Sequence, residues 1–340
     1  MPEPPRSMQT TIWPLMAGLC ILLLAPVFAR AADAPATVKL IFVGDIMVAH
    51  DEETGRLIER GEDPFEPFAG LLKEADVAVG NLECVIAEKG EPVPKTFQFL
   101  ADPRCIPVLK KHFTALTVAN NHSGDFGKLA LVEQCERLEK ANLPYFGGGR
   151  NKSDAHKPWI VERHGIRIAL LGYCEVLLPS FQAENDLPGV AWSEYDDDVL
   201  ADIKAAREKY QADVVIPFLH WGWARKPAND RQKTFARRMI DAGADVIIGA
   251  HPHVTQGAAY YKGHLIVYSL GNFLFSGFND AETQSGWALR LTLDRKGMVG
   301  WDTIVARLDE RGVPHPHLEI PSPRGRAGSS EIVQQGHSSK

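Results

Sequence analysis

The chain has 340 residues, of which 45% are hydrophobic and 24% are charged, and its formal net charge is -6. This composition is ordinary for a soluble globular chain with one large or two small domains. Lys and Arg are scattered through a mildly acidic chain, which lacks the basic stripe typical of nucleic-acid-binding proteins, so we expect no nucleic-acid partner.

The two ends of the chain differ from the rest in composition. Arg6 precedes an apolar run over residues 12–28, and Ala29-Arg30-Ala31 then has the small-residue spacing that signal peptidase recognises. Residues 1–32 are therefore predicted to be a signal peptide or, as the alternative, an uncleaved amino-terminal anchor. We expect an exported protein, periplasmic or extracellular. Residues 321–340, rich in Ser, Gly, Pro and charge, are predicted to be a disordered tail.

Between these ends, residues 35–312 have the pattern of one α/β domain. From Val38 onward, strand-like hydrophobic runs alternate with amphipathic segments. The segments predicted to be helices cover residues 128–141, 196–210 and 230–242. Strand pairs joined by short turns predict hairpins over residues 159–172 and 287–307. Because the strands of a hairpin are antiparallel, the sheet is expected to be mixed.

Six of the hydrophobic runs end in a cluster of Asp, Asn, Glu or His. The residues at these ends are Asp45, Glu83, His122, His220, the pair His251 and His253, and Asn272. In open α/β sheets, ligands bind beyond the carboxyl ends of the strands. Carboxylates from two separate strands also supply the negative charge that a cationic centre needs. Together, the six clusters predict a metal site at one edge of the sheet.

The tripeptide His251-Pro252-His253 is the strongest local signal for that site. In extended backbone, residues two apart point the same way, so both imidazoles are expected to face one centre. Neutral imidazole is the commonest protein ligand for zinc-like metals. The other histidines, including His315 and His317, follow no comparable run and are expected to be structural or on the surface.

Asn120-Asn121-His122 follows another predicted strand and combines a hard oxygen donor with a titratable group. An asparagine carbonyl suits Mn, Fe or Zn when carboxylates and imidazoles complete the ligand shell. His122 is placed to exchange a proton during a reaction, and Asp125 is placed to orient it. The alternative is a turn that is stabilised by Asn and Gly without any chemistry.

Four cysteines lie beyond the predicted signal segment: Cys84, Cys105, Cys135 and Cys174. An even number in an exported chain permits disulfides, and four cysteines allow three pairings. A domain of this size folds without such crosslinks, so buried free thiols are an equal alternative.

Seven short segments, taken together, resemble the poly-gamma-glutamate capsule biosynthesis (CapA) family, a branch of the calcineurin-like metallophosphatase superfamily. They occur in family order between about residues 38 and 310. The segments are Gly44–Met47, Gly80–Glu83, Ala119–His122 with Asp125 and Gly127, Gly147–Asn151, His220–Gly222, Gly249–His253 with Gln256 and Gly257, and Tyr268–Phe273.

This resemblance implies a four-layer α/β/β/α sandwich with mixed sheets and a dinuclear metal site at the strand ends. It implies that His122 is the catalytic histidine and that Asn81 and Asn272 lie close by as substrate-binding residues. The metal ligands implied by the family are Asp45, Glu83, Asn121, His220, His251 and His253. Two divalent ions, Mn, Fe or Zn, are the expected cofactors.

The chain departs from related sequences at three positions. Metallophosphatases of the wider superfamily usually have a histidine ligand where this chain has Met47, and a bridging aspartate where it has Asn81. Within the CapA branch, a glutamate usually follows His-Trp-Gly near the place of Ala224. Methionine is a poor ligand for hard metals, so the Met47 position bears directly on how many ions bind.

The leading functional prediction is an exported, metal-dependent, hydrolase-like enzyme of envelope or capsule polymer metabolism. Its substrate is expected to be an anionic polymer, such as poly-gamma-glutamate, or a small molecule. The alternative is a non-catalytic envelope protein that assists the assembly or export of poly-gamma-glutamate together with capsule-synthesis membrane proteins.

Overall fold

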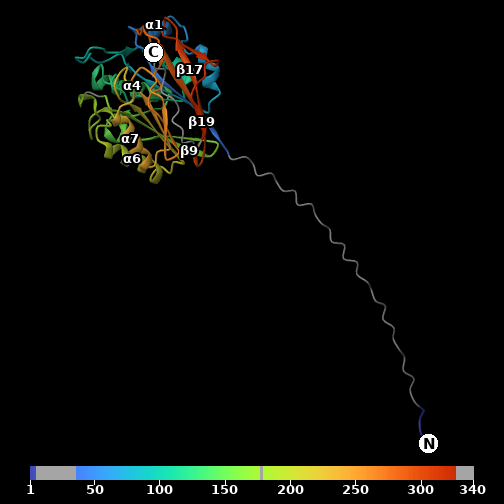
Figure 1. Ribbon diagram of the computed structural model, residues 1–340. Helices are drawn as coiled ribbons and strands as arrows, with labels where there is room; N and C mark the ends of the chain where they lie inside the picture. Colours follow the sequence, from blue (N-terminus) through green and yellow to red (C-terminus); the bar gives the residue numbers. More distant parts are fainter. Residues whose placement is uncertain (5–35, 177–178, 327–340) are drawn as a thin grey trace. The chain divides into compact units, whose positions relative to one another are not determined.

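A computed structural model describes residues 1–4, 36–176 and 179–326 (Figure 1). The predicted signal or anchor segment, apart from its first four residues, and the part of the predicted tail after residue 326 lie outside the described residues. No helix within the described ranges combines the length and the apolar character needed to cross a membrane.

The larger of two main sheets is mixed and is built around strand β1. Its strands lie in the order β18-β17-β16-β1-β2-β5-β6, with β15 also paired to β1 and β19 to β17. The pairs β1·β2, β2·β5, β5·β6 and β1·β15 are parallel, whereas β1·β16 and β16·β17 are antiparallel. The strand bounds are β1 Val38–Ile46, β2 Val77–Leu82, β5 Ala115–Thr117, β6 Tyr145–Phe146, β15 Asn272–Leu274, β16 Ser285–Asp294, β17 Gly297–Leu308, β18 Pro314–His317 and β19 Arg324–Arg326.

The second main sheet has the strand order β13-β14-β12-β11-β9-β8, and its central pairs β9·β11, β11·β12 and β12·β14 are parallel. Its strands are β8 Trp159–Arg163, β9 Ile166–Cys174, β11 Val214–His220, β12 Val246–Ala250, β13 Ala258–Tyr261 and β14 His264–Val267. Two small strand pairs complete the β structure: β3 Val85–Ile86 with β4 Leu100–Ala101, and β7 Gly148–Gly149 with β10 Gly189–Val190.

Alternating side chains along the strands face different cores, as the period of two in a β-strand requires. In β1, Leu40 and Phe42 belong to the core between the sheets, whereas Ile41 belongs to the core on the outer face of the larger sheet. In β11, Ile216 faces the same central core and Val215 faces the outer core of the second sheet. The strands read as continuous hydrophobic runs because both of their faces are buried.

Helices cover the outer face of each sheet. The core outside the larger sheet includes Leu109 of α3 and Leu138 of α4, and the core outside the second sheet includes Ile203 of α6 and Met239 of α7. The order helix, sheet, sheet, helix confirms the predicted α/β/β/α sandwich (Figure 1). The helices are α1 Glu53–Glu59, η1 Glu66–Phe68, α2 Ala69–Lys73, α3 Cys105–His112, α4 Gly127–Ala141, α5 Lys152–Ala155, η2 Pro179–Phe181, α6 Asp196–Glu208 and α7 Asp230–Asp241.

The three predicted helices correspond to α4, α6 and α7, and the two predicted hairpins to β8·β9 and β16·β17. The predicted tail needs one correction, because Arg324–Arg326 form β19 and pair with β17 instead of being disordered. Backbone hydrogen bonds to an exposed strand edge order this segment although it has few apolar side chains. The four cysteines in the described part of the chain are buried free thiols.

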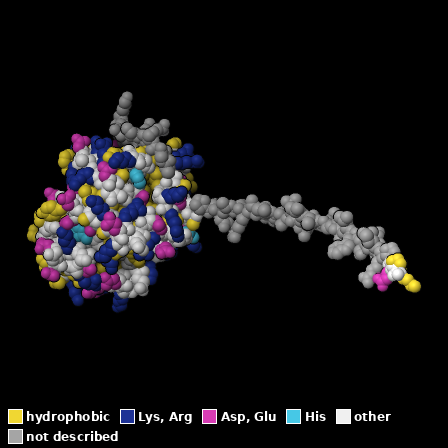
Figure 2. Space-filling model, turned by 90° about the horizontal axis from the view of Figure 1, so that it is seen from below, with side chains coloured by type: hydrophobic (Ala, Val, Ile, Leu, Met, Phe, Trp, Pro, Cys, Tyr) yellow, Lys and Arg dark blue, Asp and Glu magenta, His cyan; other side chains and the backbone are white. Residues whose placement is uncertain are grey.

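The surface carries charges of both signs. On the face shown in Figure 2, Lys and Arg side chains are interspersed with Asp and Glu. Such a pattern gives this face no continuous basic stripe.

Candidate metal centre

The strand register aligns the predicted site residues at the carboxyl ends of both sheets. On the larger sheet, Asp45 of β1 lies in register with Asn81 of β2 on one side and Asn272 of β15 on the other. On the second sheet, His220 at the end of β11 lies in register with Ala250 at the end of β12, directly before His251. Parallel pairing therefore gathers side chains that are far apart in the sequence, such as Asp45 and Asn272.

A glycine before Asp45 permits this close approach. A Cβ atom on Gly44 would lie 1.8 Å from the carbonyl oxygen of Gly271, so no other residue fits there without backbone movement. The backbone N–H of Asp45 donates to the same carbonyl oxygen at 3.1 Å. The position of Asp45 is therefore determined by backbone packing between the two segments.

Glu83 is the residue whose environment most clearly requires a cation. Its side chain is fully buried, and no donor among the described residues is hydrogen bonded to either carboxylate oxygen. Its Oε1 lies 3.7 Å from Nε2 of His220 and 3.8 Å from Nε2 of His253. A buried carboxylate without donors is costly unless it is neutralised or coordinates a metal. The residues present thus fit a metal ion.

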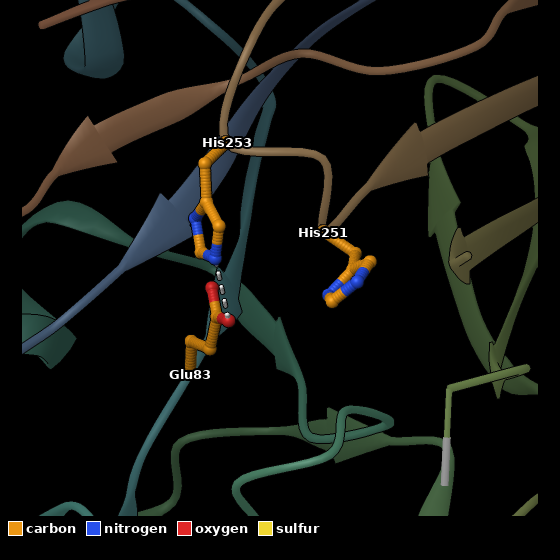
Figure 3. Close-up of side chains that lie close together, drawn as sticks. All are labelled: Glu83, His251 and His253. Atoms are coloured by element: carbon orange, nitrogen blue, oxygen red, sulfur yellow. Dashed lines mark ion pairs between the residues drawn. The ribbon is translucent and has the colours of Figure 1, made fainter. Parts of the chain in front are cut away.

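Two groups of potential ligands share Glu83. One consists of Glu83, His251 and His253, and the other of Asp45, Glu83 and His220; within each group the ligand atoms all lie within 4.8 Å of one another. Figure 3 shows the imidazole of His253 facing the Glu83 carboxylate, with His251 beside them. Carboxylate oxygens and imidazole nitrogens together form a donor set typical of Zn, Mn or Fe.

The two histidines of His251-Pro252-His253 converge for a reason other than the predicted one. Strand β12 ends at Ala250, and His251 and His253 have φ values of 96° and 58°, so neither has extended backbone. Non-glycine residues with positive φ are uncommon and concentrate at functional sites. The expectation of two side chains on one face of a strand was therefore wrong, although both residues are in the site.

Burial shifts the pKa values of two imidazoles and two carboxyl groups in the centre. Burial lowers the pKa of His220 well below its usual range, and burial with nearby His253 lowers that of His251 to about 3. Burial, followed by the charge of Asp45, raises the pKa of Glu83 well above its ordinary value, and burial also raises that of Asp45. Neutral imidazoles beside two crowded carboxylates provide the lone pairs and the negative charge that a divalent cation binds.

Asn81 and Asn272 are fully buried, and each carboxamide is hydrogen bonded at both ends. The Nδ2 of Asn81 donates to Asp45 Oδ1 at 2.8 Å, and its Oδ1 accepts from Asn120 at 3.1 Å. Asn272 contacts His253 Nδ1 through Oδ1 at 2.9 Å. In this structure both residues hold potential ligands in place, and a direct contact with substrate stays a prediction.

Asn121 and His122 lie at the same centre, after β5. The Oδ1 of Asn121 lies 2.7 Å from Nε2 of His220. His122 Nδ1 lies 2.7 Å from Oδ2 of Asp125, as the predicted pairing requires. Burial lowers the pKa of His122, and the Asp125 carboxylate opposes that shift. Because an ionised carboxylate only accepts, Nδ1 carries the proton and the lone pair is on Nε2.

Lys95 was not predicted from the sequence, and Asn120 was predicted only as part of its cluster, without a role. Lys95 donates to Asp125 Oδ1 at 2.6 Å from an irregular segment between β3 and β4. Asn120 accepts from the backbone N–H of His122 at 3.0 Å and donates to Leu82 at 2.7 Å. Asn120 was visible as part of Asn-Asn-His, but nothing in the local pattern around Lys95 indicates a role.

Met47, at the position where the resemblance to metallophosphatases led us to expect a histidine, is fully buried and belongs to the hydrophobic core outside the larger sheet. Its backbone N–H donates to Leu274 at 2.7 Å. Met47 is therefore a packing residue of that core.

A family profile described as "Bacterial capsule synthesis protein PGA_cap" matches residues 39–277, which include every strand-end cluster of the site. The chain belongs to the bacterial capsule synthesis protein PGA_cap family. Relatives of this PGA_cap chain include "PGA biosynthesis protein CapA" of Bacillus subtilis (strain 168), which is 32% identical over 268 residues, or 75% of this chain and 70% of the relative.

A second relative of the PGA_cap chain is "Capsule biosynthesis protein CapA" of Bacillus anthracis, which is 33% identical over 284 residues, or 78% of this chain and 67% of the relative. A solved structure described as a novel phosphatase from Mycoplasma pneumoniae has a TM-score of 0.53 and 17% identity, and covers 80% of this chain and 94% of its own. Because the identity is only 17%, this match shows that the PGA_cap chain shares the fold of the Mycoplasma protein and shows nothing beyond the fold.

Proposed function

We propose that this PGA_cap chain is a metal-dependent, hydrolase-like enzyme of capsule or envelope polymer metabolism, with two divalent ions at the strand ends. The observation that carries the proposal is the fully buried Glu83 carboxylate, which lacks donors among the described residues and belongs to both ligand groups. A carboxylate common to two ligand groups would supply an oxygen ligand to each of them.

Divalent ions bound there would activate water and polarise a phosphoryl or carbonyl oxygen as Lewis acids. Asp45, Glu83, Asn121, His220, His251 and His253 are the proposed ligands. His122 is the proposed proton carrier: Asp125 holds its Nδ1, and Nε2 takes up and returns a proton. The shielded position of His122, which is 7% exposed, limits exchange of that proton with bulk water.

The proposed location is the cell envelope. The names of the Bacillus relatives support it, because both refer to capsule or PGA biosynthesis. The predicted export segment at residues 1–32 agrees with it. The proposed substrate is an anionic polymer or a small molecule of that compartment, and capsule-synthesis membrane proteins are the proposed partners.

Elemental analysis of the full-length protein, followed by an activity screen with added Mn²⁺, tests this function. We expect bound divalent metal and turnover of at least one class among phosphomonoesters, phosphodiesters and gamma-glutamyl amides. The double variant His251→Ala/His253→Ala is expected to lose the metal. The matched control is His315→Ala/His317→Ala, which changes a second His-Pro-His tripeptide in β18. Metal content unaffected by the first variant contradicts the proposal.

A second candidate function is a non-catalytic envelope protein that binds an anionic polymer in the same site. The observation that favours it is the core packing of Met47, which leaves the centre without the histidine used by related phosphatases. The screen separates the two candidates, because a binder retains polymer and metal but forms no product from any of the three substrate classes.

A further inference from the structure

Lys95 reaches the metal centre from residues 87–99, the irregular segment that connects β3 to β4. Its side chain is 16% exposed. The ammonium Nζ lies 2.6 Å from Asp125 Oδ1, 2.8 Å from the carbonyl oxygen of Asn121 and 3.3 Å from Nδ1 of His122. Lys95 thus touches the proposed proton carrier, the carboxylate that orients it and the backbone of a proposed ligand.

The segment that carries Lys95 is tied to the same turn by its backbone. Val93 N donates to the carbonyl oxygen of Asp125 at 2.8 Å, and Phe99 N donates to Asp125 Oδ2 at 2.8 Å. The Phe99 ring also packs on His122, with 4.6 Å between ring centroids. Residues before and after Lys95 in the sequence therefore contact Asp125, the residue with which Lys95 forms its ion pair. These contacts restrict the side chain of Lys95, whereas a surface lysine samples many rotamers.

Among the described residues, Lys95 supplies the only lysine or arginine charge paired with an acidic residue of the centre. Within the described ranges, it is the only Lys or Arg that forms an ion pair with Asp45, Glu83 or Asp125. Lys95 balances the charge of Asp125, whereas no Lys or Arg in the described part of the chain pairs with Asp45 or Glu83. A short, charge-assisted contact of this kind holds the Asp125 carboxylate in one orientation.

The orientation of Asp125 determines which ring nitrogen of His122 carries the proton and which one has the free lone pair. With Oδ1 engaged by Lys95, Oδ2 accepts from Nδ1–H of His122 and from Phe99, so the lone pair is on Nε2. The bond from Lys95 to the Asn121 carbonyl fixes the residue before His122 at the same time. One side chain thereby supports both the proton carrier and a neighbouring oxygen ligand.

We propose that Lys95 is a positioning residue, which holds Asp125 and the Asn121–His122 backbone so that Nε2 of His122 and Oδ1 of Asn121 face the metal position. The activity arm of its test rests on the proposed hydrolase function. The competing role, a direct contact between the ammonium and an anionic substrate, predicts a change in KM instead of kcat and is an outcome of the same experiment.

The experiment uses full-length protein and the variants Lys95→Met, Lys95→Arg and Lys110→Met. Methionine keeps the length of the side chain and removes its charge. Lys110 is an exposed lysine that also donates to a backbone carbonyl, that of Ala141 at 2.7 Å, so Lys110→Met is a matched control away from the centre. Each variant is loaded with Co²⁺, whose visible spectrum reports its ligands, and is assayed for kcat and KM on the substrate found in the screen.

Lys95→Met is expected to bind Co²⁺ with an altered visible spectrum and to lose about 10- to 100-fold in kcat with little change in KM. Lys95→Arg is expected to recover part of kcat because it restores the charge. On an Asp125→Asn background, Lys95→Met is expected to change kcat by less than about twofold, because the residue through which it acts is already altered.

Three results would overturn the proposal: a Lys95→Met protein with wild-type kcat and Co²⁺ spectrum, a rise in KM with kcat unchanged, or equal losses from Lys110→Met. If Lys95→Met does not fold, Lys95→Gln provides the same comparison. If the wild-type protein binds Co²⁺ but hydrolyses nothing, the proposed hydrolase function fails, whereas the Co²⁺ spectra of the variants still test Lys95.

Discussion

Asn272 fixes the ring of His253: its Oδ1 lies 2.9 Å from Nδ1 of the imidazole, while its Nδ2 donates to the carbonyl oxygen of Thr283 at 2.9 Å. The second contact determines which end of the carboxamide is oxygen. Oδ1 can only accept, so Nδ1 of His253 carries the proton and Nε2 presents a lone pair toward Glu83.

Replacing Asn272 with alanine therefore weakens metal binding without removing a ligand. We expect the affinity for Mn²⁺ or Zn²⁺ to fall about 10- to 100-fold, because His253 loses the contact that sets its tautomer and orientation. Calorimetric titration of metal-free protein measures this. Asn185→Ala is the control, since Asn185 is exposed in a surface loop. Equal affinities for wild type and Asn272→Ala would exclude this role.

The prediction of the site depended on where each cluster stands in the chain. His-Pro-His occurs twice: residues 251–253 follow a buried strand, and residues 315–317 lie in β18 at the edge of the larger sheet. The second copy has the strand backbone that the argument from alternation assumed, yet His315 and His317 interact with Asp309 and Glu319 instead of a centre. Placement after a buried parallel strand, and not the tripeptide, distinguished the two copies.

The long periodic elements were predictable and the short ones were not. Helices α4, α6 and α7 span 15, 13 and 12 residues, enough for the 3.6-residue period to show. Helix α1 has seven residues and α3 has eight, too few for that period to stand out. Lys95 escaped prediction because an irregular segment has no period, so only the folded chain shows its contact with Asp125.

The four buried cysteines are expected to be unreactive in the native protein. Burial raises the pKa of Cys84 to about 12 and that of Cys135 to about 11, so almost no thiolate forms at neutral pH. Alkylation followed by mass spectrometry should modify Cys84, Cys105, Cys135 and Cys174 only after unfolding. A reducing agent should leave Tm unchanged, and a fall in Tm would indicate a disulfide.

Glu133 of α4 anchors the start of the segment that carries Lys95, since its carboxylate accepts from the backbone N–H groups of Glu88 and Lys89, both at 3.0 Å. Burial opposes its ionisation, but the N–H of Glu88, the Arg137 guanidinium and the N–H of Lys89 outweigh burial and lower its pKa. A lowered folded-state pKa stabilises the fold above the unfolded-state value near 4.5, and this stabilisation is lost as pH falls through the folded-state pKa.

Glu133→Gln is therefore expected to lower the free energy of unfolding by about 1 kcal/mol at pH 7 and by less at pH 3, which lies below the unfolded-state pKa, so that part of this stabilisation is already lost. Denaturant unfolding at the two pH values measures the difference. Glu136→Gln, an exposed position of the same helix, is the control. A loss that is equal at both pH values would show that the charge of Glu133 is not what matters.

Glu83 should show opposite effects on metal binding and on the stability of the metal-free protein. Without a cation, its carboxylate is buried beside Asp45 with no donor among the described residues. Glu83→Gln replaces a carboxyl group whose ionisation is disfavoured by burial and by Asp45 with a neutral amide that can donate to Asp45, so the metal-free variant should be more stable than metal-free wild type by about 1–3 kcal/mol. The same variant should lose metal binding, because Glu83 belongs to both ligand groups.

Thermal unfolding in EDTA and with Mn²⁺ measures both effects: EDTA should lower Tm of wild type and leave that of the variant unchanged. A metal-free variant less stable than metal-free wild type would show that Glu83 has a structural role that outweighs its buried charge.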